Sequence, residues 1–283
     1  MRELTAIDSR SYVVAFEFRQ GAGCPPDFHL PPAAARFDEG VFVPRGDKDW
    51  LGRYAWPPRV LLLSGDEFWV VTHPSANEAP CGRAIDRISF AESGHMLLRG
   101  WLGFRGAGFD CTVRYNTRGH PSVLGFMRHF RNRWLGAARP APSEVALGDA
   151  LDMRFANALA DELDPGESVG TRFFQLPRQL KGHWPLRRSQ WIPGDLLAVT
   201  SSRLLWLTDR DRGSRAQYGG IASYAPLHAP LRLSLVSRPG GCHFEVHSGG
   251  VPPWVIPIAA ERRRDAESFV AAPLQGPIAT LSA

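Results

Sequence analysis

The sequence predicts an α+β protein that is mostly β and consists of two similar halves, each ending in a helix. Two observations lead to this fold class. First, RVLLLSGDEFWVVTH at residues 59–73 aligns without gaps with DLLAVTSSRLLWLTDR at residues 195–210, at an offset of 136 residues. Second, strand-like runs and then a helical pattern follow both stretches. Repetition over this distance indicates duplicated domains, because solenoid proteins repeat about every 20 to 50 residues.

Each aligned stretch is typical of a β-hairpin. Two apolar runs of leucine, β-branched and aromatic residues flank a short polar connection, Gly65-Asp66-Glu67 in the first half and Ser201-Ser202-Arg203 in the second. Apolar residues occupy both faces of these strands, so we expect each hairpin to be covered on both sides. Among the core residues we expect Trp206 to be largely buried.

Further strands and then a helix are expected after each hairpin. The strand-like runs are AIDRISF, MLLRGWLGF and FDCTVRY in the first half, and GGIASYA, LRLSLVS, CHFEVH and WVIPI in the second. In HPSVLGFMRHFRNRWLG, five apolar residues recur at helical spacing: Val123, Phe126, Met127, Phe130 and Trp134. AAERRRDAESFVAAPLQG is typical of a closing helix that ends near Pro273. We therefore expect helices near residues 122–135 and 259–271, in equivalent places.

The stretch GAARPAPSEV, residues 136–145, has the composition of a linker. It divides the chain into a first domain at residues 1–140, with an N-terminal extension of unassigned role, and a second domain at residues 141–283. The second domain is expected to start with a helix, because ALDMRFANALADELDPGES carries an apolar stripe and Asp164-Pro165-Gly166 then ends the helix.

The second half resembles the bacterial PH-like domains over about residues 160–272. The resemblance rests on LDPGES, a following strand, the LLAVTSSRLLWLTD hairpin, more strands and a final helix. The matching residues are Asp164, Pro165, Gly166, Glu167, Thr200, Arg203, Leu204 and Leu205. The first half is similar to this family through the repeat. The resemblance implies two tandem PH-like domains, each a strongly bent antiparallel sheet with a C-terminal helix. It implies binding or scaffolding, and it supplies no catalytic residues.

The most informative polar feature is the basic segment within SVGTRFFQLPRQLKGHWPLRRSQWIPG, residues 168–194, which contains no acidic residue. The candidate residues for an anionic partner are Arg172, Arg178, Lys181, Trp184, Arg187 and Arg188. In a PH-like layout they span the first strand and the loop into the second, where eukaryotic relatives hold inositol phosphates. The adjacent pair Arg187-Arg188 departs from the relatives' pattern of two bases separated by one residue. A solvated loop without a partner is the favoured interpretation of this segment. An anionic membrane surface, a protein partner and nucleic acid, in that order, remain open as alternatives.

GESVG, residues 166–170, is the one motif that suggests an enzyme, because it matches the G-x-S-x-G pattern with Ser168 as the nucleophile. That motif needs a strand before the serine and a helix after it. Here a helix is expected before Ser168 and a strand, VGTRFFQL, after it. A helix-stop turn is therefore the favoured interpretation, and a serine hydrolase is the alternative function.

Metal and cofactor sites are not expected. His243 and His247 of HFEVH alternate with Phe244 and Val246, which indicates a strand, and four residues along a strand span about 13 Å. The four cysteines are far apart in sequence, and no C-x-x-C occurs. No apolar run approaches the roughly 18 residues that span a bilayer, and MRELTAIDSR has no signal core. We therefore expect a cytoplasmic, non-enzymatic binding or scaffolding protein without a catalytic residue, metal or cofactor.

Overall fold

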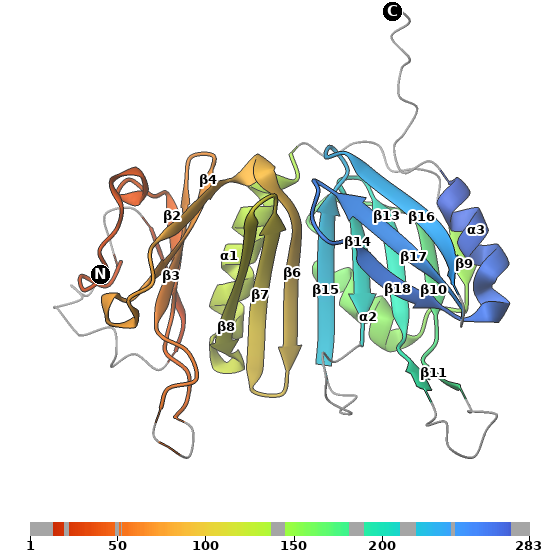
Figure 1. The fold of residues 1–283 in the computed structure, drawn as a ribbon, viewed down its shortest axis with the longest axis horizontal. Helices are drawn as coiled ribbons and strands as arrows, with labels where there is room; N and C mark the ends of the chain where they lie inside the picture. The colour runs from red at the N-terminus through yellow and green to blue at the C-terminus, as the bar shows by residue number, and fades with distance from the viewer. Residues whose placement is uncertain are drawn as a thin grey trace, which may run out of the picture. The chain divides into compact units, whose positions relative to one another are not determined.

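A computed structural model of the chain describes residues 14–19, 23–48, 51, 53–136, 145–180, 190–209, 219–238 and 241–272 (Figure 1). The described part is α+β and mostly β, as the sequence predicts. The chain divides into two compact units. Unit 1 comprises Met1–Ile88, His95–Phe104 and Phe109–Trp134, and unit 2 comprises Ser89–Gly94, Arg105–Gly108 and Leu135–Ala283. Within the described residues, no helix is long and apolar enough to cross a membrane.

Unit 1 begins with a five-stranded antiparallel sheet and ends with a helix. The strand order follows the sequence: β1 (Phe16–Arg19), β2 (Glu39–Val43), β3 (Arg59–Ser64), β4 (Glu67–Thr72) and β5 (Cys81–Ala84). Next come β6 (Ile88–Met96), β7 (Arg99–Gly106) and β8 (Phe109–Asn116), which neighbour one another in order. Of these strands, Ser89–Gly94 of β6 and the end of β7 from Arg105 belong to unit 2. The chain of unit 1 then forms α1 (His120–Trp134). Short 3-10 turns occupy Pro32–Ala34, Pro74–Ala76, Ile85–Arg87 and Thr117–Gly119.

Unit 2 contains a longer sheet, a three-stranded sheet and two helices. The longer sheet has the order β15 (Gly219–Pro226), β14 (Arg203–Thr208), β13 (Asp195–Thr200), β10 (Val169–Gln175) and β9 (Val145–Gly148), with β9 parallel to β10. A small pair, β11 (Arg178–Leu180) and β12 (Gln190–Ile192), extends the β10–β13 connection. The three-stranded sheet is β16 (Leu231–Arg238), β17 (Gly241–Ser248) and β18 (Trp254–Ile258). The helices are α2 (Met153–Glu162) and α3 (Arg263–Ala271), and the 3-10 turn Ala260–Arg262 precedes α3.

The repeat in the sequence corresponds to a repeat in the structure. The β3–β4 hairpin occupies Arg59–Ser64 and Glu67–Thr72, and the β13–β14 hairpin occupies Asp195–Thr200 and Arg203–Thr208, so all four boundaries differ by the predicted offset. Both predicted hairpins and all three predicted helices are confirmed, although α3 starts a few residues later than expected. Two strand predictions are wrong. MLLRGWLGF is not a single strand, because β6 ends at Met96 and β7 begins at Arg99, and AIDRISF is interrupted by the 3-10 turn Ile85–Arg87 between β5 and β6. Residues 137–144 of the expected linker lie outside the described residues.

Both faces of the β13–β14 hairpin are buried, as the sequence predicts. One face contributes Leu197, Leu204 and Trp206 to a core that the three-stranded sheet and α3 complete. Covering the opposite face, α2 packs Phe155 on Phe174 of β10, with ring centroids 5.0 Å apart. The unit 2 core also includes Phe90 of β6. Hydrophobic burial on both faces explains why these strands have no polar alternation.

The β3–β4 hairpin of unit 1 is covered in a different way. On one face Phe68 packs against Phe104 of β7 and Phe130 of α1, with ring centroids 4.3 and 5.5 Å away. On the other face the N-terminal segment, residues 23–38, supplies Phe28 and Phe37 to a second core. That segment therefore does in unit 1 what α2 does in unit 2. The sequence left this role unassigned.

Candidate functional site

The described part of the basic segment is its beginning. Arg172 lies half-buried on β10, beside Ala146 of β9 and Ala198 of β13. Arg178 begins β11. Lys181, Trp184, Arg187 and Arg188 lie outside the described residues. The structure therefore places two of the six candidate residues and leaves their convergence with the other four a prediction.

Arg178 pairs with acidic residues of its own chain. Its Nη2 lies 3.0 Å from Oδ2 of Asp149, and its other terminal nitrogen pairs with Glu261. Arg262 also pairs with Asp149, and the Leu176 N–H donates to the same carboxylate at 2.9 Å. Burial opposes ionisation of Asp149, but these hydrogen bonds and arginine charges outweigh it, so the pKa of Asp149 lies below its ordinary value. Arg178 thus anchors the base of the β11–β12 loop to the start of α3.

The residues that carry the PH-like resemblance meet in a buried ion network. Arg203 is fully buried, and its guanidinium lies 2.5 Å from Glu167 and 3.3 Å from Asp164. It also donates to the backbone carbonyl of Glu162 at the end of α2 and lies over the ring of Tyr224, 5.3 Å from the centroid. The network joins the end of α2 to β14 and β15. The sequence indicated these residue types but not that they pair.

Glu167 also fixes the β13–β14 turn. One of its carboxylate oxygens accepts hydrogen bonds from the hydroxyls of Thr200, at 2.5 Å, and Ser202, at 2.6 Å. The Thr200 hydroxyl in turn accepts from the backbone N–H of Arg203 at 3.1 Å. These contacts satisfy polar groups that would otherwise be buried without partners. The motif Asp-Pro-Gly-Glu with Thr200 and Arg203 is therefore a structural device of unit 2.

Ser168 lies on an exposed turn between α2 and β10. Its backbone N–H donates to the Ser201 hydroxyl at 3.4 Å, and its carbonyl accepts from the Ser201 N–H at 3.0 Å. A strand follows the serine, as the sequence predicts, whereas the nucleophile motif needs a helix there. The geometry supports the helix-stop interpretation of GESVG.

His243 and His247 lie on β17 and share a carboxylate. The Nε2 atoms of the two histidines lie 3.1 Å from the two different oxygens of Glu245, which stands between them. Phe244 and Val246 are fully buried on the opposite face, so the expected alternation is confirmed. Across the described residues, no group of three or more His, Cys, Asp or Glu side chains is arranged to hold a metal ion. The sequence did not predict the bridging role of Glu245.

Asp195 is a fully buried carboxyl at the start of β13. It accepts hydrogen bonds from the Trp206 indole N–H at 2.8 Å and from the Gln175 amide at 3.0 Å. The Gln175 amide nitrogen also donates to the carbonyl of Pro257, and its amide oxygen accepts from the N–H of Ala259. Burial raises the pKa of Asp195 to about 6, although hydrogen bonds from Trp206, Thr208 and Gln175 partly oppose the shift. This network ties the longer sheet of unit 2 to the end of β18.

This carboxyl should make the stability of the protein depend on pH between about 4 and 6. Because the folded-state pKa lies above the ordinary value of 3.8, the folded protein holds a proton that the unfolded chain releases. The ionised carboxylate therefore lowers the free energy of unfolding above pH 6, by about 3 kcal/mol, and this penalty disappears as the pH falls towards 4. Asp195→Asn should flatten that part of the profile, measured as urea unfolding free energy against pH. The control Asp110→Asn, at an exposed position, should leave the profile as in the parent.

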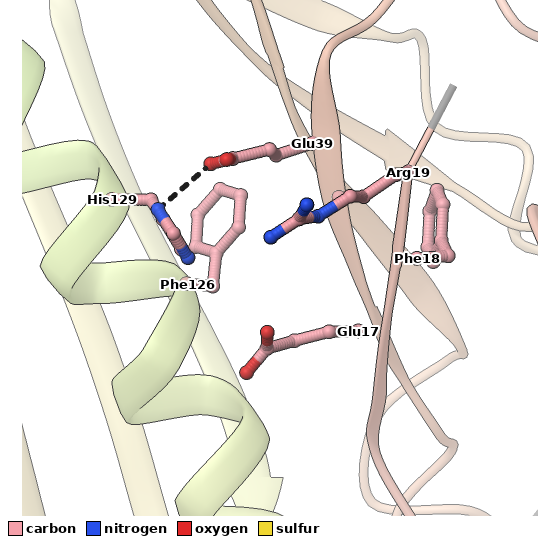
Figure 2. A pocket seen from close by; sticks show the side chains of 7 residues that line it. Glu17, Phe18, Arg19, Glu39, Phe126 and His129 are labelled. Atoms are coloured by element: carbon pink, nitrogen blue, oxygen red, sulfur yellow. Dashed lines mark ion pairs between the residues drawn. The ribbon is translucent and has the colours of Figure 1, made fainter.

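Unit 1 contains a small polar pocket between β1, β2 and α1 (Figure 2). Its volume is about 110 Å³, and it is lined by Glu17, Phe18, Arg19, Glu39, Gly40, Phe126 and His129. His129 Nδ1 lies 3.2 Å from Glu39, and the Arg19 guanidinium points between the carboxylates of Glu17 and Glu39. Pockets that enclose drug-sized ligands measure roughly 300–1,000 Å³, so this one has room for a few water molecules. The sequence did not predict it because its residues come from three separate segments.

All four cysteines are free thiols. Burial raises the pKa of both Cys24 and Cys111 to about 11. A nucleophilic cysteine needs the thiolate form, which such an environment disfavours at neutral pH. These two partly buried thiols therefore do not have the environment of a catalytic nucleophile.

Comparison with known proteins adds no assignment. No family model, curated protein or solved structure matches the chain.

Proposed function

We propose that the chain is a non-enzymatic binding protein made of two tandem PH-like domains. The observation that carries the proposal is the shared element order of the two units. In each unit a hairpin is followed by further strands and then by a closing helix, and the hairpins keep the offset of 136 residues. In the PH-like family this arrangement serves binding or scaffolding. The four free cysteines support a cytoplasmic location.

An anionic membrane surface is the proposed partner of the basic segment. Residues 181–189 connect β11 to β12, and β11 is anchored because Arg178 pairs with Asp149 and Glu261. The connection carries Lys181, Arg187 and Arg188 and no acidic residue. Each Lys or Arg close to an anionic bilayer contributes roughly 1 kcal/mol, so three of them give a salt-sensitive attachment.

Charge reversal tests this surface. The double variant Arg187→Glu with Arg188→Glu should lose most low-salt binding to vesicles that contain phosphatidylserine, measured by co-sedimentation. The matched control reverses another adjacent pair, Arg263→Glu with Arg264→Glu, which is exposed on α3 and should change binding little. If binding is unchanged by this charge reversal and is lost instead in Trp184→Ala, the tryptophan and not the charge of the segment makes the membrane contact.

The alternative function, a serine hydrolase, is tested with a fluorophosphonate probe. We expect no labelling of the full chain. Labelling that Ser168→Ala abolishes would overturn the non-enzymatic proposal, whatever the vesicle experiment shows.

A further inference from the structure

The turn between β6 and β7 presents two large apolar side chains to solvent. Leu97 is 71% exposed and Leu98 is 61% exposed, and the two are adjacent at the tip of the hairpin. Figure 1 shows this turn where the lower ends of β6 and β7 meet. Most exposed apolar residues occur singly and need no explanation, but an adjacent pair at a turn is unusual.

Leu97 occupies a backbone conformation that leucine does not favour. Its φ is +50°, in the left-handed region, where a Cβ clashes with the backbone and where glycine is the ordinary residue of a tight hairpin turn. The turn is held in place, because the Thr117 hydroxyl donates to the carbonyl of Leu97 at 2.9 Å. The Thr117 N–H also donates to the carbonyl of Leu98 at 3.1 Å. Glycine here would relieve the strain and remove an exposed apolar group, so this leucine does not serve the fold.

The surroundings of the turn are basic. Arg99 directly follows Leu98, and Arg118 directly follows the Thr117 that holds the turn, and both side chains are exposed. The stretches at 95–101 and 114–122 contain no aspartate or glutamate. Within the part of the chain that the structure describes, neither arginine forms an ion pair. Two apolar side chains therefore stand between two uncompensated positive charges.

We propose that the β6–β7 turn inserts Leu97 and Leu98 into an anionic phospholipid bilayer, with Arg99 and Arg118 at the headgroup phosphates. Attachment of this kind combines burial of apolar side chains at the membrane interface with attraction to anionic lipids, and two such contributions are needed for stable binding. The fixed turn presents the leucines without a further cost of ordering the chain. This surface belongs to unit 1 and is independent of the basic segment in unit 2.

The test uses the full chain and vesicles of phosphatidylserine with phosphatidylcholine, sedimented at low and high salt. Part of the parent protein's vesicle binding should persist at high salt, because the burial of leucine side chains is not screened by ions. Leu97→Gly with Leu98→Ser should lower that part by about tenfold or more. The thermal midpoint of this variant should equal or exceed that of the parent, which separates lost binding from lost folding. Added to the Arg187→Glu with Arg188→Glu variant, Arg99→Glu with Arg118→Glu should further lower the binding that remains at low salt.

The controls distinguish this surface from the basic segment. Met153→Ser, at the most exposed large apolar residue described, should leave binding unchanged. If Arg187→Glu with Arg188→Glu keeps the salt-resistant binding while the leucine variant loses it, the turn is the inserting element and the basic segment is not required. If the leucine variant binds like the parent, or the parent does not sediment with these vesicles, the proposed insertion is overturned.

Discussion

Replacing Arg203 with alanine should lower the free energy of unfolding by about 3–5 kcal/mol, because it leaves buried carboxylates without their cation. Arg203 is fully buried, and the Glu167 side chain that it pairs with is only 4% exposed. Urea denaturation followed by circular dichroism measures the change. The expected loss is larger than that of any exposed arginine, since surface ion pairs contribute about 0–1 kcal/mol.

Two further variants test this explanation. Arg264→Ala removes an exposed arginine from α3 and should shift the unfolding midpoint little. Arg203→Met with Glu167→Gln should lie nearer to the parent than Arg203→Met alone, because the second change removes the unpaired carboxylate. If Arg203→Ala behaves like Arg264→Ala, the buried network does not stabilise unit 2.

Trp206→Ala should cost a similar amount, about 3–5 kcal/mol, the usual range for a large core aromatic. Trp206 is only 9% exposed and packs against Trp254 of β18, with ring centroids 5.7 Å apart. The substitution leaves a cavity between the two sheets of unit 2 and also removes the indole N–H that Asp195 accepts. Thermal unfolding of the variant measures the loss.

Trp206→Phe separates these two contributions. Phenylalanine retains most of the buried ring but cannot donate to Asp195, so its effect should lie between those of the parent and of Trp206→Ala. Because a protonated Asp195 depends less on the lost donor, the Phe variant should approach the parent as the pH falls below 6. An unchanged midpoint in Trp206→Ala would contradict a core position.

The hairpins and helices were predictable because their signals are local. Apolar runs around a polar turn indicate a hairpin within about fifteen residues, and the spacing of Val123, Phe126 and Phe130 indicates a helix without reference to the rest of the chain. The split of MLLRGWLGF between β6 and β7 was not predictable by this reasoning. Leucine has no turn propensity, so Leu97 and Leu98 resemble strand residues in the sequence.

Contacts between residues that are far apart in the chain could not be predicted from the sequence. One acidic partner of Arg178 is Asp149, which lies 29 residues before it, and nothing local links the two. Phe90 likewise lies in the first half of the sequence, but the stretch Ser89–Gly94 belongs to unit 2 and Phe90 joins its core. The resemblance to PH-like domains includes Glu167 and Arg203, but their pairing depends on the fold, which brings α2 beside β14.

The N-terminal cover of unit 1 has a consequence for synthesis of the protein. Phe28 and Phe37 leave the ribosome before Val60 and Val71, the strand residues that they shelter. At translation rates of about 5–20 residues per second, these phenylalanines wait several seconds without a surface to pack on. During that interval both side chains are exposed and accessible to chaperones. The core beneath the five-stranded sheet of unit 1 cannot form until β4 has emerged. Nascent chains halted before β4 should therefore be more protease-sensitive at residues 23–38 than chains halted after it.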